Sequence, residues 1–292
     1  MHDGDQPVLP RLARALIDRQ MPEYAGLPLR RVAGGGTDNV LYRLGPGLLV
    51  RFPRRAWADA EIDRLQRWLP VLAPGLPVEV PLVLRRGEAG PGYPFRWTVG
   101  PWLKGRDAFA TPPEPARAVS DVAGFLRALW ACPCPPDAPL RAGADVLGLK
   151  LAGIEAAIDG FQDEADKALL CDRVAEAREV PVFRGRPVWV HGDLHALNVL
   201  TRRGRMTGVI DWGGMGLGDP GMDLSAAWTL FEAPGRRMLQ AALQPEEGAW
   251  ARGRVRALIM AVLAIPYYRQ SNPVFYRAMR QVLARVLAGW KA

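Results

Sequence analysis

The sequence predicts an α+β protein of two lobes, a small β-rich N-terminal lobe over residues 1–100 and a larger, mainly helical C-terminal lobe over residues 101–292. Two patterns indicate this division. Short apolar runs separated by Gly and Pro fill the first third of the chain and are typical of strands. After residue 101, apolar residues recur at helical spacing through most of the chain. A chain of 292 residues is long enough for two separate hydrophobic cores.

The N-terminal lobe is expected to begin with a short helix at 11–19, where the apolar side chains share one helical face. The elements that follow are strands at 29–33, 40–44 and 48–53, a helix at 56–69, and strands at 81–84 and 95–99. The first three strands form a meander whose first hairpin is rich in glycine. The helix is expected to end before Pro70, because proline disrupts the interior of a helix.

The C-terminal lobe is expected to be helical apart from two short strands. Helices are predicted at 118–131, 146–161, 164–179, 224–231, 246–264 and 273–288, and strands at 188–190 and 206–210. The proline-rich stretch 132–139 is the clearest long loop. No internal repeat or low-complexity segment interrupts this order.

Composition indicates a soluble, cytoplasmic protein. Hydrophobic residues make up 49% and charged residues 23% of the chain, which is ordinary for a globular protein. The first ten residues lack the basic start and apolar core of a signal peptide. The longest apolar stretch, 257–266, is too short to span a bilayer, so we expect no membrane partner. Three cysteines are too few for a disulfide framework and are interpreted as free thiols.

The net charge of +8 does not indicate a nucleic-acid partner. The basic residues are scattered along the chain as arginine doublets, without a basic run interleaved with aromatic residues. Nor does the sequence contain a recognised nucleic-acid-binding motif. We interpret most of this charge as solvated surface.

The strongest chemical signal lies in residues 189–213, where three polar side chains have the spacing that phosphoryl transfer requires. Asp193 precedes Asn198 by five residues, and Asp211 follows Asn198 by thirteen. A kinase uses one carboxylate to orient the attacking hydroxyl, and an amide and a second carboxylate to hold Mg²⁺ on the nucleotide phosphates. The pattern predicts Asp193 as the catalytic base and Asn198 and Asp211 as Mg²⁺ ligands. Each alone could be a turn residue, but together they favour the catalytic interpretation.

The glycine-rich hairpin of the N-terminal lobe is a candidate phosphate-binding loop. Gly35 and Gly36 have no Cβ, so their backbone amides can approach phosphate oxygens. Thr37 is a candidate to donate its hydroxyl to a phosphate. Glycine triplets also occur in plain hairpins, and that alternative stays open.

Three further residues complete the predicted nucleotide site. Arg51 lies on the third strand, where kinases carry a phosphate-binding lysine, and Glu61 on the next helix is its candidate partner. Arginine binds phosphate with a different geometry from lysine, and a plain surface ion pair is the alternative. Trp102, near the junction of the lobes, is the candidate border of the base pocket. Two later aspartates, Asp219 and Asp223, are interpreted as structural, the second as a helix cap or a brace beneath the catalytic loop.

Taken together, these motifs resemble the aminoglycoside phosphotransferase family, small-molecule kinases that include the macrolide phosphotransferases. The resemblance covers nearly the whole chain and rests on five motifs: 35–39 with 41–44, 49–53, 191–195 with Asn198, 210–213, and 218–220 with Asp223. It implies a bilobal protein-kinase-like fold and transfer of the γ-phosphate of ATP or GTP to a hydroxyl of a small molecule. Antibiotic resistance, with an aminoglycoside or a macrolide as acceptor, would fit this family.

The same resemblance implies Asp193 as the base, Asn198 and Asp211 as Mg²⁺ ligands, and Thr37, Arg51 and Glu61 as groups that serve the phosphates. Because arginine replaces the lysine of many members at Arg51, a non-catalytic relative that binds a nucleotide or another ligand remains the alternative. A protein kinase is less favoured, since 213–223 is too short for an activation segment. A polycationic acceptor would need converging carboxylates and a macrolide an apolar surface, and the sequence leaves both open.

Overall fold

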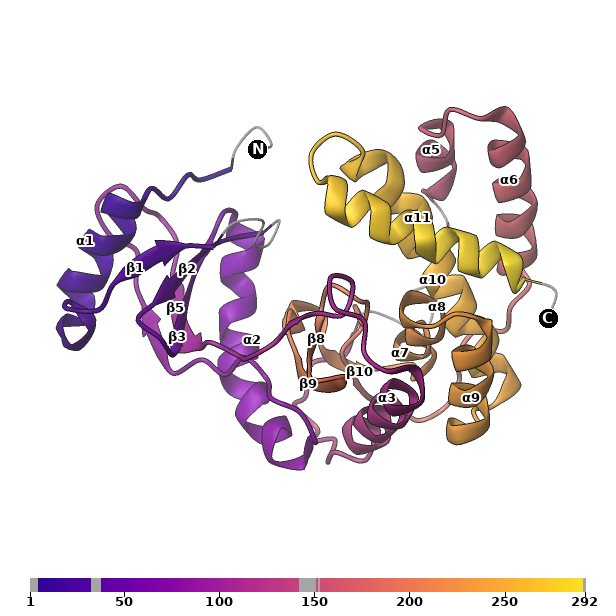
Figure 1. Ribbon diagram of the computed structural model, residues 1–292, viewed down its shortest axis with the longest axis horizontal. Coiled ribbons are helices and arrows are strands. Elements are labelled where there is room, and N and C mark those ends of the chain that lie inside the picture. The colour runs from indigo at the N-terminus through magenta and orange to yellow at the C-terminus, as the bar shows by residue number, and fades with distance from the viewer. Residues whose placement is uncertain (1–4, 33–37, 142–150, 152, 291–292) are drawn as a thin grey trace. The chain divides into compact units, whose positions relative to one another are not determined.

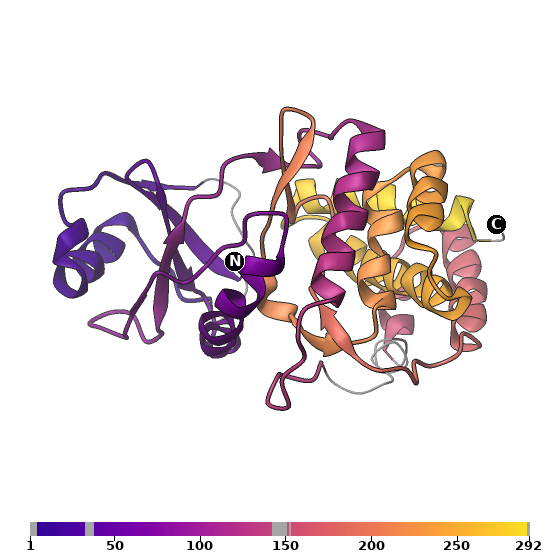
Figure 2. The same ribbon diagram turned by 90° about the horizontal axis from the view of Figure 1, so that it is seen from below.

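The computed structural model describes residues 5–32, 38–141, 151 and 153–290. Contacts divide the chain into two compact units, which Figures 1 and 2 show from two directions. The N-terminal unit comprises Met1–Pro74 and Glu79–Lys104, and the C-terminal unit comprises Gly75–Val78 and Gly105–Ala292. The first is built on an antiparallel sheet and the second mainly on helices, so the predicted α+β class is confirmed.

An antiparallel sheet in the order β1-β2-β3-β5-β4 forms the centre of the N-terminal unit. Its strands are β1 (Leu29–Arg31), β2 (Asn39–Leu44), β3 (Leu48–Pro53), β4 (Arg85–Gly87) and β5 (Trp97–Pro101). The predicted meander of the first three strands is confirmed. Alternation along β2 and β3 sends Val40, Tyr42, Val50 and Phe52 to one buried face. The expected strand at 81–84 is wrong, because β4 begins only at Arg85.

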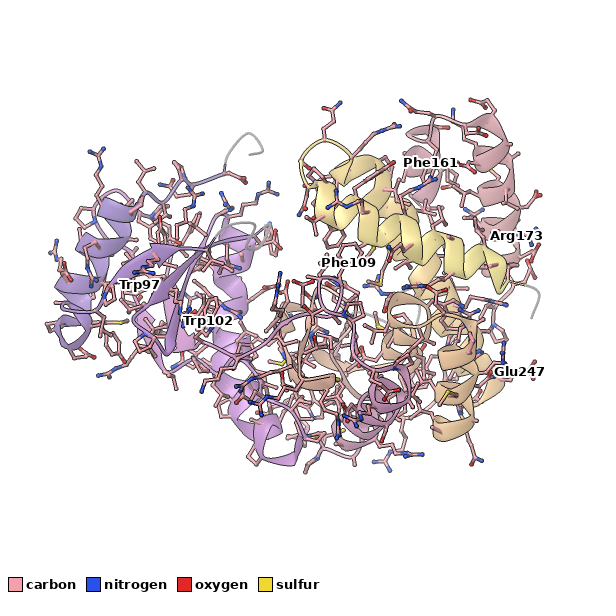
Figure 3. The ribbon with its side chains drawn as sticks, viewed as in Figure 1. Trp97, Trp102, Phe109, Phe161, Arg173 and Glu247 are labelled. Atoms are coloured by element: carbon pink, nitrogen blue, oxygen red, sulfur yellow. The ribbon has the colours of Figure 1, made fainter. Side chains whose placement is uncertain are left out.

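Two helices accompany this sheet, and Figure 1 shows them on opposite sides of it. Helix α1 (Pro10–Gln20) buries Ala13, Leu16 and Ile17 in the core that contains Phe52 and Trp97; Trp97 is labelled in Figure 3. Helix α2 (Ala56–Leu72) contacts β3 and β5. The prediction that α2 ends before Pro70 is wrong. Leu69 and Leu72 are fully buried, and this burial offsets the hydrogen bond that proline cannot donate.

The C-terminal unit contains two small antiparallel sheets. In the first, β7 (Val188–Val190) pairs with β10 (Gly216–Gly218). In the second, β8 (Val199–Arg202) lies between β6 (Arg106–Asp107) and β9 (Arg205–Val209). The strands at 188–190 and 206–210 were expected, whereas β6, β8 and β10 were not. These two sheets carry the loops of the candidate site.

Helices make up most of the C-terminal unit. They are α3 (Pro115–Trp130), α5 (Ile154–Asp159), α6 (Glu164–Arg178), α7 (Gly221–Leu224), α8 (Ala226–Leu230), α9 (Ala233–Leu243), α10 (Glu247–Tyr268) and α11 (Pro273–Ala288). The single helix expected at 224–231 is wrong: α7 and α8 are separate and meet at Ser225. Helix α9 was not predicted. Of the helix expected at 146–161, residues 146–150 and 152 lie outside the described residues.

Helix α10 is the central element of the C-terminal unit, and its middle is buried from Val255 to Val262. Gly253 sets how closely α10 approaches α7. A Cβ at this position would lie 2.8 Å from the Leu224 Cβ and 3.2 Å from the Gly221 carbonyl oxygen. The absence of a side chain at Gly253 therefore permits the close crossing.

All three cysteines belong to the C-terminal unit as free thiols: Cys132 is buried, while Cys134 and Cys171 are exposed. Within the described ranges, no helix combines the length and the apolar character needed to cross a bilayer.

Candidate active site

The fully buried side chain of His191 holds the loop that follows β7. Its Nε2–H donates to the carbonyl oxygen of Ile210 at 3.0 Å, and its Nδ1 accepts the backbone N–H of Asp193 at 3.2 Å. The imidazole also packs edge-on against Trp212, with the ring centroids 4.8 Å apart. Both ring nitrogens are used in the neutral tautomer, and burial lowers the pKa of His191 to about 4. The ring therefore links the loop to the end of β9.

Asp223 supports the same loop from α7. Its Oδ2 accepts the backbone N–H of His191 at 2.8 Å and its Oδ1 accepts that of Gly192 at 2.7 Å. Burial raises the pKa of Asp223 to about 6, against the two backbone hydrogen bonds that favour the carboxylate. The interpretation of Asp223 as a brace beneath the loop is confirmed.

Gly192 satisfies two requirements at once. Its φ of +79° lies in the left-handed region, which L-residues with a Cβ rarely adopt. A Cβ at this position would also lie 2.1 Å from Nη1 of Arg141. Only glycine therefore fits here without displacing a neighbouring side chain.

Asp193 presents a carboxylate that is partly exposed, with 39% of its side-chain surface accessible. Its Oδ2 accepts a hydrogen bond from Asn198 Nδ2 at 3.2 Å and lies 3.4 Å from Nε2 of His195. Burial would raise the pKa of Asp193, but His195 and then Arg256 outweigh it and hold that pKa below the ordinary carboxyl range. The group is therefore ionised at neutral pH and can orient a hydroxyl.

Asn198 and Asp211 are brought to the same end of a hairpin by the pairing of β8 with β9. Val199 pairs with Val209, and the N–H of Ile210 donates to the carbonyl oxygen of Asn198 at 2.9 Å. Asn198 also donates its side-chain N–H to the Asp193 carbonyl oxygen at 2.9 Å. Asp211 follows directly, with φ 65° and ψ 62°. The fold thus gathers Asp193, Asn198 and Asp211 at one place, within the C-terminal unit.

His195, which is 2% exposed, fills the space beside these groups. Its ring contacts Phe275 of α11 edge to face at 5.4 Å, and Phe275 in turn packs against Tyr268 of α10 at 4.5 Å. The next ring, Tyr267, is 51% exposed. An aromatic row therefore leads from the Asp193 loop toward solvent. Its residues beyond His195 belong to α10 and α11, two helices that contact each other and lie side by side in Figure 1.

The predicted phosphate-binding residues belong to the N-terminal unit. Arg51 alternates with the core residues of β3 and therefore points to the other face of the sheet, where α2 contacts β3 and β5. Glu61 lies half-buried on α2. The predicted phosphate-binding residues Gly35, Gly36 and Thr37 lie outside the described residues. The phosphate-binding roles remain predictions.

Trp102 directly follows β5 of the same sheet. Its backbone N–H donates to the Gly47 carbonyl oxygen at 2.8 Å, and the guanidinium carbon of Arg43 lies 4.8 Å from the centre of its ring. Figure 3 labels this tryptophan in the N-terminal unit. A border role at the base pocket stays a prediction.

Sequence reasoning missed the arginines that support the site from α10. Arg252 pairs with Asp219, its Nε donating to Oδ2 at 2.6 Å and its Nη2 to Oδ1 at 3.2 Å. Arg256 donates to the Gly192 carbonyl oxygen at 2.9 Å. The available signal was the spacing of two arginines by four residues in a strongly apolar helix, which places both on one face.

The model of a family described as "Phosphotransferase enzyme family" matches residues 29–258. No curated protein matches the chain. Among solved structures, a GDP complex of aminoglycoside 2′-phosphotransferase-IIIa is similar at a TM-score of 0.73 and 19% identity, covering 94% of this chain and 97% of the other.

Two further solved structures share the fold. The type I macrolide 2′-phosphotransferase is similar at a TM-score of 0.62 and 21% identity, covering 94% of this chain and 98% of the other. A spectinomycin phosphotransferase in complex with ADP and spectinomycin is similar at a TM-score of 0.71 and 12% identity, covering 97% of this chain and 98% of the other. The predicted kinase-like bilobal fold of these enzymes is confirmed.

Proposed function

The chain belongs to the phosphotransferase enzyme family, and we propose that it transfers the γ-phosphate of ATP or GTP to a hydroxyl of a small molecule. The observation that carries this proposal is the arrangement of Asp193 and Asn198, which hydrogen-bond to each other at the end of the hairpin that leads into Asp211. One ionised carboxylate, one amide and a second carboxylate are the groups that phosphoryl transfer uses.

In this reaction Asp193 orients the acceptor hydroxyl and takes its proton. The hydroxyl oxygen forms a bond to the γ-phosphorus while the bond from that phosphorus to the bridging oxygen breaks, which releases ADP or GDP. The low pKa of Asp193 means that the carboxylate chiefly aims the hydroxyl, since it is a weak base. Proton transfer is then completed late, as phosphorus–oxygen bonding advances.

Asn198 and Asp211 suit Mg²⁺ as ligands. Because the Asn198 amide nitrogen donates to Asp193, the amide oxygen is the atom suited to a cation. Among the described residues, no group of three or more His, Cys, Asp or Glu side chains could hold a metal ion, so Mg²⁺ would take the rest of its ligands from phosphates and water, as it commonly does. When bound, Mg²⁺ would neutralise charge on the phosphate oxygens.

The N-terminal unit is the proposed nucleotide-binding part, and the C-terminal unit the proposed catalytic and acceptor-binding part. Gly35, Gly36, Thr37, Arg51 and Glu61 would serve the phosphates, and Trp102 would border the base. Relatives that bind GDP, or ADP with spectinomycin, support a nucleotide partner and an antibiotic acceptor. An aminoglycoside or a macrolide is accordingly the first acceptor to test, with antibiotic resistance as the corresponding role.

The test is a nucleotide-consumption screen with ATP and GTP, with and without Mg²⁺, across aminoglycosides, macrolides and simple alcohols. We expect acceptor-dependent release of ADP or GDP. Asp193→Asn should lower kcat by at least about 100-fold, because the amide cannot take the proton, and nucleotide binding should persist. Asp172→Asn, an exposed change on α6, is the matched control and should leave turnover unchanged.

The alternative is a non-catalytic relative, and the arginine at position 51 is the feature that favours it. Nucleotide binding without turnover for any acceptor, and identical behaviour of Asp193→Asn and the unaltered chain, would support this alternative. An Arg51→Lys variant that gains turnover would trace the inactivity to that residue.

A further inference from the structure

Helix α10 carries two arginines that are almost fully buried: Arg252 is 4% exposed and Arg256 is 8% exposed. A buried guanidinium loses its hydration and is retained only where protein groups replace it. Arg252 has such a partner in Asp219, with a bidentate ion pair. The contacts of Arg256 are of a different kind and point to a different task.

Arg256 reaches the catalytic loop at two consecutive residues. Its Nη2 donates to the carbonyl oxygen of Gly192 at 2.9 Å and lies 3.8 Å from Oδ1 of Asp193. The first contact is a hydrogen bond to the peptide that precedes the base. The second is an ion pair too long to be a hydrogen bond. A single guanidinium nitrogen therefore holds both the backbone and the carboxylate of the loop.

The reach of Arg256 depends on the close crossing at Gly253. Gly253 and Arg256 are three residues apart and lie on the same face of α10. Since a Cβ at Gly253 would meet Leu224 of α7 at 2.8 Å, a larger residue would push α10 away from the loop. Glycine at position 253 therefore lets α10 lie close enough to the loop for Arg256 to contact Gly192 and Asp193.

The two oxygens of Asp193 have different surroundings. Oδ2 accepts from Asn198 and faces His195. Oδ1 lies 3.8 Å from Nη2 of Arg256, which is too far for a hydrogen bond. The guanidinium therefore attracts Oδ1 electrostatically but does not occupy one of its lone pairs. Oδ1 is consequently the atom suited to accept the proton of an incoming hydroxyl, while Arg256 limits rotation of the carboxylate.

We propose that Arg256 is a positioning residue of the phosphotransfer reaction, which holds the Gly192 peptide and Oδ1 of Asp193 so that the carboxylate points at the acceptor hydroxyl. This inference rests on the proposed function. It assigns to α10 a direct influence on kcat, separate from the structural ion pair formed by Arg252.

The test compares Arg256→Met and Arg256→Lys with the unaltered chain by steady-state kinetics. Methionine removes the charge and the donors but keeps much of the volume, so kcat should fall by about 100-fold while the KM of the nucleotide changes less than about two-fold. Lysine retains the charge and should recover part of the lost kcat. Arg254→Met, on the same helix with its guanidinium near Trp290, is the matched control and should keep kcat.

Chemical rescue guards against simple misfolding. In Arg256→Ala, millimolar guanidinium should restore part of kcat, whereas the neutral isostere urea should not, because the loop needs a cation with donors. An active parent whose Arg256→Met variant keeps its kcat, or an Arg256→Ala variant for which guanidinium and urea act alike, overturns the role of Arg256. A parent with no turnover for any acceptor overturns the proposed function and this role with it.

Discussion

At the scale of single residues, we expect the loop that carries Asp193 to be most sensitive to substitution at Gly192. Gly192→Ala should destabilise the fold, since the left-handed backbone alone costs a residue with a Cβ about 1–2 kcal/mol and the contact with Arg141 adds to this. Turnover should also fall, because the peptide that precedes Asp193 would shift. Urea denaturation and kcat measure the two effects.

A second glycine provides the control. Gly124 lies in α3, is exposed, and has open space where a Cβ would be. Gly124→Ala should therefore stabilise the protein by about 0.5–1 kcal/mol and leave kcat unchanged. Equal effects of the two substitutions would contradict the role given to the Gly192 backbone.

His191 makes stability depend on pH in a defined window. Its pKa of about 4 in the folded protein lies below its ordinary value, so between about pH 4 and 6.5 the unfolded chain binds a proton that the folded chain does not. The free energy of unfolding should rise with pH across that window, by up to about 1.4 kcal/mol per pH unit from this group.

The measurement compares the chain with His191→Gln by urea denaturation at several pH values. The stability advantage of the histidine should be largest near neutral pH and should shrink toward pH 4. Asp223, whose pKa is raised to about 6, acts with the opposite sign, but it is present in both proteins and cancels to a first approximation. A stability difference that does not vary with pH would contradict this account.

Sequence predicts individual residues where chemistry fixes their spacing. Asp193, Asn198 and Asp211 could be predicted as one group from their spacing, and the structure brings them to the end of one hairpin, while their catalytic and metal-binding roles stay predictions. Arg256 was missed because its contact with Gly192 joins residues 64 positions apart and depends on how α10 crosses α7. How closely two helices cross depends on packing between residues that are distant in the sequence, and no local sequence pattern encodes it.

At the scale of elements, the turn between β8 and β9 is a place where the sequence is not optimal. Arg203 has φ 53° and Gly204 has φ 75°, which is the combination that favours Asn-Gly in a two-residue hairpin. Arg203→Asn should raise stability by about 0.5–1 kcal/mol, since asparagine tolerates this backbone better than arginine. Thermal unfolding measures the gain. Arg202→Asn, in the strand beside it, should give none.

Helices and strands were predicted well where the apolar pattern repeats over many residues, and poorly where the element is only a few residues long. The helices at 164–179 and 273–288 were expected within a residue of α6 and α11. The strand β10 was missed, because its sequence Gly-Leu-Gly carries no strand signal and it forms only by pairing with β7. The predicted end of α2 before Pro70 was wrong for a similar reason: burial of one face of the helix outweighed the local preference of proline against a helix interior.

At the scale of the whole molecule, ligand binding should be visible as stability. If the chain binds a nucleotide with Mg²⁺, saturation at 100 times the Kd stabilises the folded state by about 2.7 kcal/mol. We expect the thermal midpoint to rise with ATP or GTP in the presence of Mg²⁺ and to return toward the unliganded value when EDTA removes the metal. Asp211→Asn should weaken the metal-dependent part of this rise. A rise that EDTA does not change would contradict metal-linked nucleotide binding.

The distribution of thiols gives the chain a ready means of optical labelling. Cysteine occurs only in the C-terminal unit, and Cys132 is shielded there by burial, so maleimide dyes will attach at Cys134 and Cys171 alone. Replacing one of those two by serine and introducing Trp57→Cys on the exposed side of α2 gives one reactive position in each unit. The efficiency of energy transfer between two dyes at these positions then reports changes in the distance between the two units during a turnover cycle.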